Sequence, residues 1–297
     1  MRFLPPKKPF LPGRPNICEL EEPVVPLKYH FISGLPRSGS TLLSALLRQN
    51  PRFIAGMSSP VSPLFNNMFK VMNSHELKVV FDEKRRISML KNLVDSFYAE
   101  AGPEQVVFDT NRNWTGKMAL LAKLYPDSRI ICCVRGLPWI IDSVEKMLAK
   151  NPLYLSNIFK PERDNSVYKR ADSLMNADNG LIGLPFNTLR EAWFGDFAKR
   201  LIVIPYEPLA QNPKGTLNLL YKELGEKPFT HDFENVQYDE PAYDENLGMP
   251  GLHKVREKVE YKERKPAIPP DLYNKYAPAA FWTKLENNPR GVTIIQP

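Results

Sequence analysis

One stretch of the sequence combines the residue types that bind an anion. It reads GLPRSGST over residues 34–41, between an apolar run that is typical of a strand and one that is typical of a helix. Glycines let backbone amides turn inward on an anion, and the N-terminus of the following helix adds partial positive charge. Hydroxyl groups and an embedded guanidinium supply further donors. The candidate anion contacts are Pro36, Arg37, Ser38, Gly39, Ser40 and Thr41.

This loop lacks the lysine of the nucleoside triphosphatases. In those proteins a lysine at the position of Ser40 reaches the β- and γ-phosphates of the nucleotide. Here the positive charge lies inside the loop, at Arg37. The pattern therefore disfavours ATP or GTP hydrolysis and indicates a shorter anion close to the apex of the loop. A plain glycine turn with a solvated arginine is the alternative interpretation.

A second anion-binding pattern follows a later apolar run. The run RIICCV ends just before Arg135, and Ser143 lies inside a helix that Pro138 is expected to open. Ser143 should lie about a turn and a half into that helix, on the side that faces back toward the loop. An arginine and a hydroxyl that converge on one point suit a phosphate dianion. Taken alone, such a pair is also compatible with a solvated helix start.

Together these two patterns resemble the donor site of sulfotransferases that use 3′-phosphoadenosine 5′-phosphosulfate (PAPS). FISGLPRSGSTLL resembles their 5′-phosphosulfate loop, in the arginine form shared by tyrosylprotein sulfotransferases and many bacterial enzymes. VRGLPWIIDSVEK resembles their 3′-phosphate motif, and the likeness runs from about residue 30 to about residue 213. The resemblance implies that Arg37 contacts the bridging and sulfuryl oxygens as the phosphate departs. It implies that Arg135 and Ser143 hold the 3′-phosphate.

Two further motifs resemble the same family more weakly. VIPYEPLAQNP resembles a strand whose following tyrosine lies near the nucleotide, which implies a purine-side contact for Tyr206. A core tyrosine at a strand end is the alternative. GLHKVR resembles a late basic loop that closes over the nucleotide, which implies a donor contact for Lys254. Basic loops are also common on ordinary surfaces, so a solvated loop is the alternative there.

The catalytic base is where the sequence departs from these relatives. Tyrosylprotein enzymes have a glutamate where this chain has Ser58 and Ser59, and cytosolic enzymes have a histidine in the segment that here reads VVFDTNRNW. Asp109 is the candidate base, because it follows a predicted strand on the ligand side of the sheet. A helix cap or an ion pair with Arg112 would also explain Asp109. Of the four histidines, His253 is the one near a matched motif.

The resemblance implies an enzyme, a PAPS-dependent sulfotransferase with PAPS as its donor substrate. Sulfuryl transfer resembles phosphoryl transfer, with a loose transition state and charge spread over the peripheral oxygens. Because the departing phosphate is already a good leaving group, we expect no metal ion. The acceptor is predicted to be a small hydroxylated or amino-bearing metabolite, of the kind found in secondary metabolism. A P-loop kinase-like enzyme and a non-catalytic nucleotide-binding protein are the alternatives.

The elements that must position these residues alternate between strands and helices. This alternation predicts an α/β fold of three layers, with a central parallel sheet and helices on both faces. The resemblance described above implies that this is the P-loop-like sulfotransferase fold. Ligands of such sheets bind beyond the carboxyl ends of the strands, where every motif above lies. The predicted strands are Lys28–Ser33, Gln105–Phe108, Arg129–Val134 and Leu201–Ile204. The predicted helices are Thr41–Gln49, two within Met68–Glu100, Thr115–Tyr125, Pro138–Lys150, one from a capping box at Thr188 to about Lys199, and Pro213–Leu224.

Composition shifts along the chain predict its domain organisation. Residues 1–26 are rich in proline and predict an extended N-terminal arm. For residues 27–297 the resemblance implies a single sulfotransferase domain. Within that domain, 151–187 and 230–270 are rich in Pro, Asn, Asp and Tyr. They predict irregular lids or acceptor-binding loops.

The overall composition is that of a globular protein suited to an anionic ligand. The net charge is +7 over 297 residues, but no dense Lys/Arg run accompanies it, so we expect no nucleic-acid partner. No apolar stretch is long enough for a membrane span or a signal peptide. The three cysteines, Cys18, Cys132 and Cys133, predict no disulfide framework. A reduced, cytoplasmic protein is therefore predicted, and a homodimer is left open because the family's dimer motif is not evident.

Overall fold

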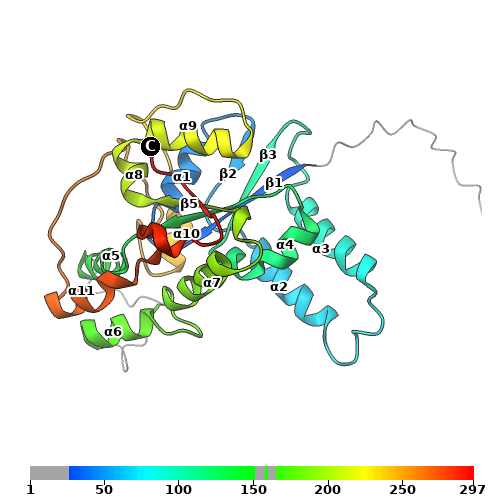
Figure 1. Cartoon of the computed structure of the whole chain (residues 1–297), viewed down its shortest axis with the longest axis horizontal. Coiled ribbons are helices and arrows are strands. Elements are labelled where there is room, and N and C mark those ends of the chain that lie inside the picture. The colour runs from blue at the N-terminus through cyan, green and yellow to red at the C-terminus, as the bar shows by residue number, and fades with distance from the viewer. Residues whose placement is uncertain (1–26, 151–157, 160–164) are drawn as a thin grey trace, which may run out of the picture.

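The fold is a six-stranded parallel sheet with helices on both faces (Figure 1). The computed structural model describes residues 27–150, 158–159 and 165–297. The predicted arm 1–26 lies outside the described residues, and so do 151–157 and 160–164 of the first predicted lid segment. The predicted α/β architecture of three layers is confirmed.

The strand order places β1 near the centre of the sheet. The order is β2-β3-β1-β4-β5-β6, and every neighbouring pair is parallel. The carboxyl ends of all six strands therefore meet at one edge, and the loops after β1, β3, β4 and β5 lie side by side. The strands are β1 (Lys28–Gly34), β2 (Phe53–Ala55), β3 (Val106–Thr110), β4 (Ile130–Val134), β5 (Leu201–Pro205) and β6 (Thr293–Ile294).

Side chains alternate between two hydrophobic cores, one on each face of the sheet. In β4, Ile130 and Cys132 belong to one core, and Ile131 and Cys133 belong to the other. The smaller core is covered by α1 (Ser40–Leu47), α8 (Tyr206–Gln211) and α9 (Pro213–Leu224). The larger core is covered by α2 (Val61–Met72), α3 (Glu83–Phe97), α4 (Met118–Leu124), α5 (Leu137–Lys150), α6 (Val167–Leu174), α7 (Gly183–Phe194) and α11 (Pro270–Tyr276).

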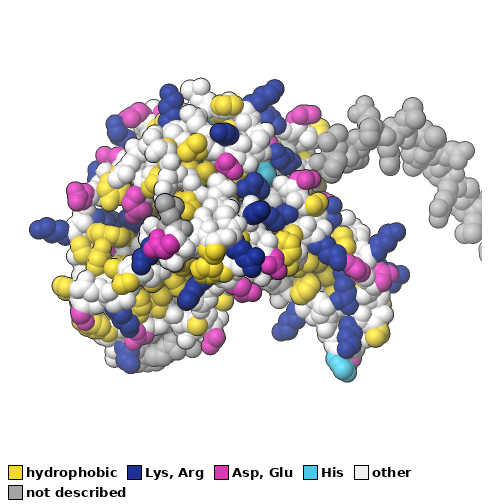
Figure 2. All heavy atoms as spheres, viewed as in Figure 1, with side chains coloured by type: hydrophobic (Ala, Val, Ile, Leu, Met, Phe, Trp, Pro, Cys, Tyr) yellow, Lys and Arg dark blue, Asp and Glu magenta, His cyan; other side chains and the backbone are white. Residues whose placement is uncertain are grey.

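The α2–α3 hairpin projects from the body of the molecule (Figure 1). Phe65 and Val94 anchor its base in the larger core, whereas Val79 in its connecting turn is 82% exposed. In the space-filling view, charged side chains are spread along the hairpin (Figure 2). None of the helices within the described ranges is long and apolar enough to cross a bilayer.

Most predicted helices are present with small shifts at their ends. α9 spans the predicted residues, with a proline in its first turn and Gly225 as a left-handed C-cap at φ 67°. The capping box at Thr188 is wrong, because α7 already begins at Gly183 and buries Phe186 and Leu189. The hydroxyl of Thr188 instead donates to the carbonyl of Pro185 at 3.2 Å.

The two segments predicted to be irregular differ in outcome. The first contains α6 and the start of α7, so the prediction is wrong for much of its described part. The sequence signal that went unused is Ser166, whose side chain accepts from the amide of Lys169 and caps α6. The second segment is irregular apart from α10 (Pro241–Asn246).

Candidate functional site

A cavity of about 790 Å³ lies at the carboxyl edge of the sheet. Its walls come from the loops after β1 to β5, from α5, and from residues 243–264, which lie over the edge. This is the position where α/β sheets bind ligands, and the size is usual for a ligand pocket. Among the described residues ten basic side chains line the cavity, against one acidic side chain, Glu260, so it is suited to an anionic ligand. The ten are Arg37, Arg112, Arg135, Lys146, Lys150, Lys254, Arg256, Lys258, Lys262 and Arg264.

The loop between β1 and α1 contains two glycines at positions where a side chain would crowd a neighbouring residue. A Cβ at Gly34, where φ is 106°, would lie 2.3 Å from the carbonyl oxygen of Cys133 in the neighbouring strand. A Cβ at Gly39, where φ is 93°, would lie 3.1 Å from the ring of Tyr206. Arg37 itself has φ 57°, and it is the one non-glycine residue with positive φ in the described part of the chain. Such a conformation costs about 1–2 kcal/mol and is typical of a functional site.

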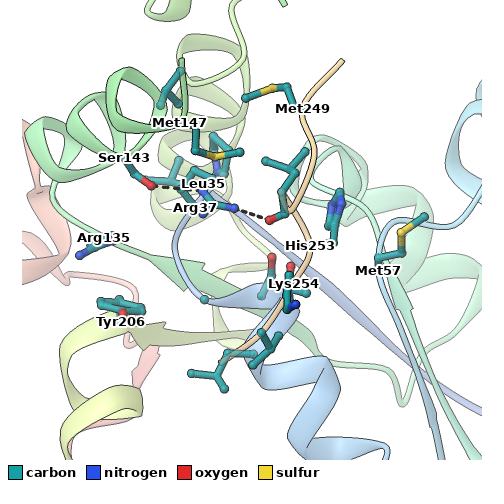
Figure 3. Close-up of a pocket in the computed structure, with 18 of the residues that line it drawn as sticks. Leu35, Arg37, Met57, Arg135, Ser143, Met147, Tyr206, Met249, His253 and Lys254 are labelled. Carbon is teal, nitrogen blue, oxygen red and sulfur yellow. Dashed lines mark hydrogen bonds between the residues drawn. The ribbon is translucent and has the colours of Figure 1, made fainter. Parts of the chain in front are cut away.

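Arg37 is held over the cavity by neutral partners (Figure 3). Its Nε donates to Oγ of Ser143 at 3.2 Å, and its Nη1 donates to the carbonyl oxygen of Leu252 at 2.5 Å. Burial, and next the charge of Arg135, lower the pKa of Arg37. Because neither bond is to a carboxylate, the charge of the guanidinium stays available to an anion.

Arg135 is held by the ring of Tyr206. Its guanidinium carbon lies 4.0 Å from the ring centroid, a cation–π contact that leaves the N–H groups free to donate. Its Nε is buried without a hydrogen-bond partner. A buried donor left unsatisfied costs about 1–3 kcal/mol, so the site fits a ligand that accepts this hydrogen bond.

A buried carboxylate near Arg135 binds two further basic side chains. Asp142 of α5 is fully buried and accepts from Arg264 at 2.7 Å, from Lys146 at 3.0 Å and from the amide of Ala267 at 2.6 Å. The charge of Arg264 lowers the pKa of Arg135, although burial of Arg135 is the larger cause. Arg264 escaped the sequence analysis, although it lies in a stretch rich in Lys and Arg after Lys254.

The structure brings nearly all the predicted donor contacts to this one cavity. They are Pro36, Arg37, Gly39, Ser40, Thr41, Arg135, Ser143, Tyr206 and Lys254. Ser38 is the exception: it is fully buried behind the loop, and its hydroxyl donates to the carbonyl of Pro36 at 3.2 Å. It therefore supports the loop, and its hydroxyl does not face a ligand. Lys254 lies at the rim, with its side chain 69% exposed.

The surroundings of Asp109 do not favour its predicted role as the base. Its side chain is fully buried outside the cavity wall. It accepts hydrogen bonds from the side chains of Ser59 at 2.5 Å, Tyr98 at 2.7 Å and Trp114 at 2.6 Å. Burial raises its pKa, and the three hydrogen bonds oppose that effect. The alternation of side chains along β3 turns Asp109 into the core, where it is neither a helix cap nor a partner of Arg112.

His253 lines the cavity and is paired with a buried carboxylate. Its Nδ1 lies 2.5 Å from Oδ1 of Asp244 in α10, and its backbone amide donates to Oδ2 at 2.8 Å. Asp244 is fully buried, so it fixes the imidazole with Nε2 as the free nitrogen. Figure 3 shows His253 on the opposite side of Arg37 from Arg135 and Tyr206. The sequence showed His253 near a motif but carried no signal of its pairing with Asp244.

Comparison with known proteins found one matching family model and several similar solved structures. Residues 30–231 match the model of the sulfotransferase family. A solved structure of the sulfotransferase domain from the curacin biosynthetic pathway is similar, with TM-score 0.53, 16% identity, and coverage of 85% of this chain and 96% of that chain. The sulfotransferase domain of the Synechococcus PCC 7002 olefin synthase has TM-score 0.45 and 16% identity, with coverage of 85% of this chain and 94% of that chain. A sulfotransferase from Alicyclobacillus acidocaldarius has TM-score 0.43 and 18% identity, with coverage of 75% of this chain and 90% of that chain. No curated protein matches the sequence.

Proposed function

This chain belongs to the sulfotransferase family, and we propose that it transfers a sulfuryl group from PAPS to a hydroxyl or amine of a small acceptor. One observation carries the proposal. Two arginines, Arg37 and Arg135, line the same cavity at the ends of the paired strands β1 and β4, and within the described residues neither is bonded to a carboxylate. A molecule with an anion at each end, such as PAPS, would satisfy both.

The donor has a position for each of its anionic ends. The backbone amides of the loop, the hydroxyls of Ser40 and Thr41, and Arg37 would bind the 5′-phosphosulfate. Arg135, with Arg264 nearby and Ser143 in the same cavity, would bind the 3′-phosphate. Tyr206 lies between these two positions, against Gly39 on one side and Arg135 on the other, and would face the purine end.

The transfer itself is a single displacement at sulfur. The acceptor oxygen or nitrogen forms a bond to sulfur while the bond from sulfur to the bridging oxygen breaks, and that electron pair leaves on the 5′-phosphate. Arg37 and the loop amides stabilise the developing charge, an effect whose loss commonly costs about 10²–10³ in rate. The acceptor proton passes to Nε2 of His253, and Asp244 stabilises the imidazolium. The step calls for no metal ion, which stays a prediction.

Transfer of labelled sulfate from PAPS tests the proposal. With a panel of hydroxyl and amine acceptors, the unmodified protein should form labelled product and release 3′-phosphoadenosine 5′-phosphate (PAP). Arg37→Ala should lose this turnover and keep the fold. A protein that consumes ATP with Mg²⁺ would be the kinase-like alternative. One that binds PAP tightly but sulfates nothing would be the non-catalytic alternative. Either result would contradict the proposal.

A further inference from the structure

We propose that the acceptor carries its own carboxylate or phosphate, and that Arg112 binds this anion. The inference rests on the proposed function, because it concerns the other half of the same cavity. It narrows the acceptor from any small hydroxylated or amino compound to an acidic one. The argument uses the position of Arg112 in the sheet, its rigid attachment, its lack of a counter-charge and its neighbours.

Arg112 lies on the side of the cavity that the donor leaves open. It follows β3, which pairs with β1 on the side opposite β4. The donor anchors follow β1, β4 and β5. In-line transfer requires the acceptor to approach sulfur from the side opposite the leaving phosphate. An anchor after β3 is therefore on the approach path of the acceptor.

The backbone around Arg112 is tied to the centre of the sheet. The carbonyl oxygen of Arg112 accepts from Oγ of Ser33 at 2.9 Å, and the amide of Asn111 donates to the carbonyl of Ile32 at 2.9 Å. Both partners lie in β1. Trp114, two residues further on, is fully buried. A side chain mounted on such a rigid turn is positioned before the ligand arrives, which is what a specificity contact needs.

Arg112 has no counter-charge within the described residues. Its guanidinium is partly buried and lines the cavity, and it makes no hydrogen bond or ion pair with another described side chain. Burial lowers its pKa, and the Tyr243 hydroxyl is the one described group that opposes this effect. Arg264 in the same cavity is instead neutralised by Asp142. A partly buried cation without a partner is costly, and an anionic ligand removes that cost.

Tyr243 connects Arg112 to the catalytic end of the cavity. Its ring packs edge-on against His253, with 5.4 Å between the ring centroids, and both Tyr243 and Arg112 line the cavity. An anion on Arg112 would therefore lie in the same cavity as the proposed base and its aromatic neighbour. The remaining wall on this side includes Met57 and Met249. The acceptor should thus be an acid with an apolar body and a nearby hydroxyl or amine.

Pairs of compounds that differ in one charge would test this inference. The probes are 4-hydroxyphenylacetate and 3-hydroxyoctanoate, each compared with its neutral methyl ester. Sulfation with PAPS is measured first. The shift that each compound produces in the melting temperature of the PAP-saturated protein is measured second, so that binding is scored without turnover. The proteins are wild type, Arg112→Met, and the control Arg190→Met, which removes an exposed arginine of α7 that does not line the cavity.

Wild type and the control should prefer each acid over its ester by about tenfold to a hundredfold, because a hydrogen bond to a charged group strengthens binding by that much. Arg112→Met should lose this preference, keep its PAP affinity, and melt no lower than wild type. Equal use or equal binding of acid and ester by wild type would overturn the inference and leave sulfuryl transfer intact. Weaker PAP or PAPS binding in Arg112→Met would assign Arg112 to the donor and also overturn it. Failure of wild type to bind PAP would instead contradict the proposed function.

Discussion

The contact between Arg135 and the 3′-phosphate can be isolated with two ligands that differ by that group. PAP is AMP with a phosphate added at the 3′ position. Arg135 offers a buried, unpaired Nε and a guanidinium that is fixed over Tyr206. Hydrogen bonds to charged groups contribute about 1.5–3 kcal/mol. We therefore expect wild type to bind PAP about tenfold to a hundredfold more tightly than AMP.

Calorimetry on a cycle of variants measures this contribution directly. Arg135→Met should bind PAP and AMP with nearly equal affinity, because the interaction between the residue and the phosphate is gone. Tyr206→Leu removes the cation–π contact, worth about 1 kcal/mol for a partly buried pair, so it should weaken PAP binding about fivefold. Tyr206→Phe keeps the ring and should have little effect.

The matched control is Arg48→Met. Arg48 also lies over a tyrosine ring, 5.4 Å from the centroid of Tyr238, but it does not line the cavity. This variant should leave the preference for PAP unchanged. If wild type binds PAP no better than AMP, or if Arg135→Met keeps the full preference, the assignment of the 3′-phosphate position is refuted.

Three further predictions concern the base, the buried carboxylate and acid stability. His253→Gln should lower kcat by about 10²–10⁴ with unchanged PAP affinity, and steady-state kinetics that show full activity would remove His253 as base. Asp109→Asn should lower the free energy of unfolding by about 1–3 kcal/mol in urea titrations. It should leave kcat unaffected, because the side chain of Asp109 lies outside the cavity. A loss of kcat without a loss of stability would contradict this prediction. Burial lowers the pKa of His30 to about 3 from the ordinary 6.5. The contribution of neutral His30 to the free energy of unfolding should therefore be fully present above about pH 6.5 and decline as the pH falls toward 3. In denaturant titrations His30→Asn should show a shallower decline over that range, whereas an unchanged slope would show that His30 does not contribute.

The residues of the proposed donor half could be picked out because their sequence signals are local. Arg37 lies in a loop that contains its own glycines, and Arg135 directly follows a buried strand. Each residue can therefore be recognised from the few residues around it in the sequence. The four long strands are apolar on both faces and were found for the same reason. β2 and β6 have three and two residues, too few for a pattern to emerge.

The acceptor half could not be predicted because its contacts join distant residues. The pairing of His253 with Asp244 occurs in a segment without periodicity, and nothing in the sequence links Arg112 to Tyr243. Asp109 shows the opposite error. It stands at a strand end as a base would, but three donors from separate parts of the chain, including Tyr98 and Ser59, hold it in the core.

The central place of β1 in the sheet has a consequence for engineering. The wall on the β3 side, apart from α10 and the residues that follow it, is built from one uninterrupted stretch of chain between α1 and β4, which contains β2, the α2–α3 hairpin, β3 and Arg112. The proposed nucleotide wall is built from the loop between β1 and α1, which holds Arg37, and from β4 onward. Exchange of the stretch from β2 to Arg112 between homologous enzymes should therefore change which compound is modified and leave the donor contacts in place.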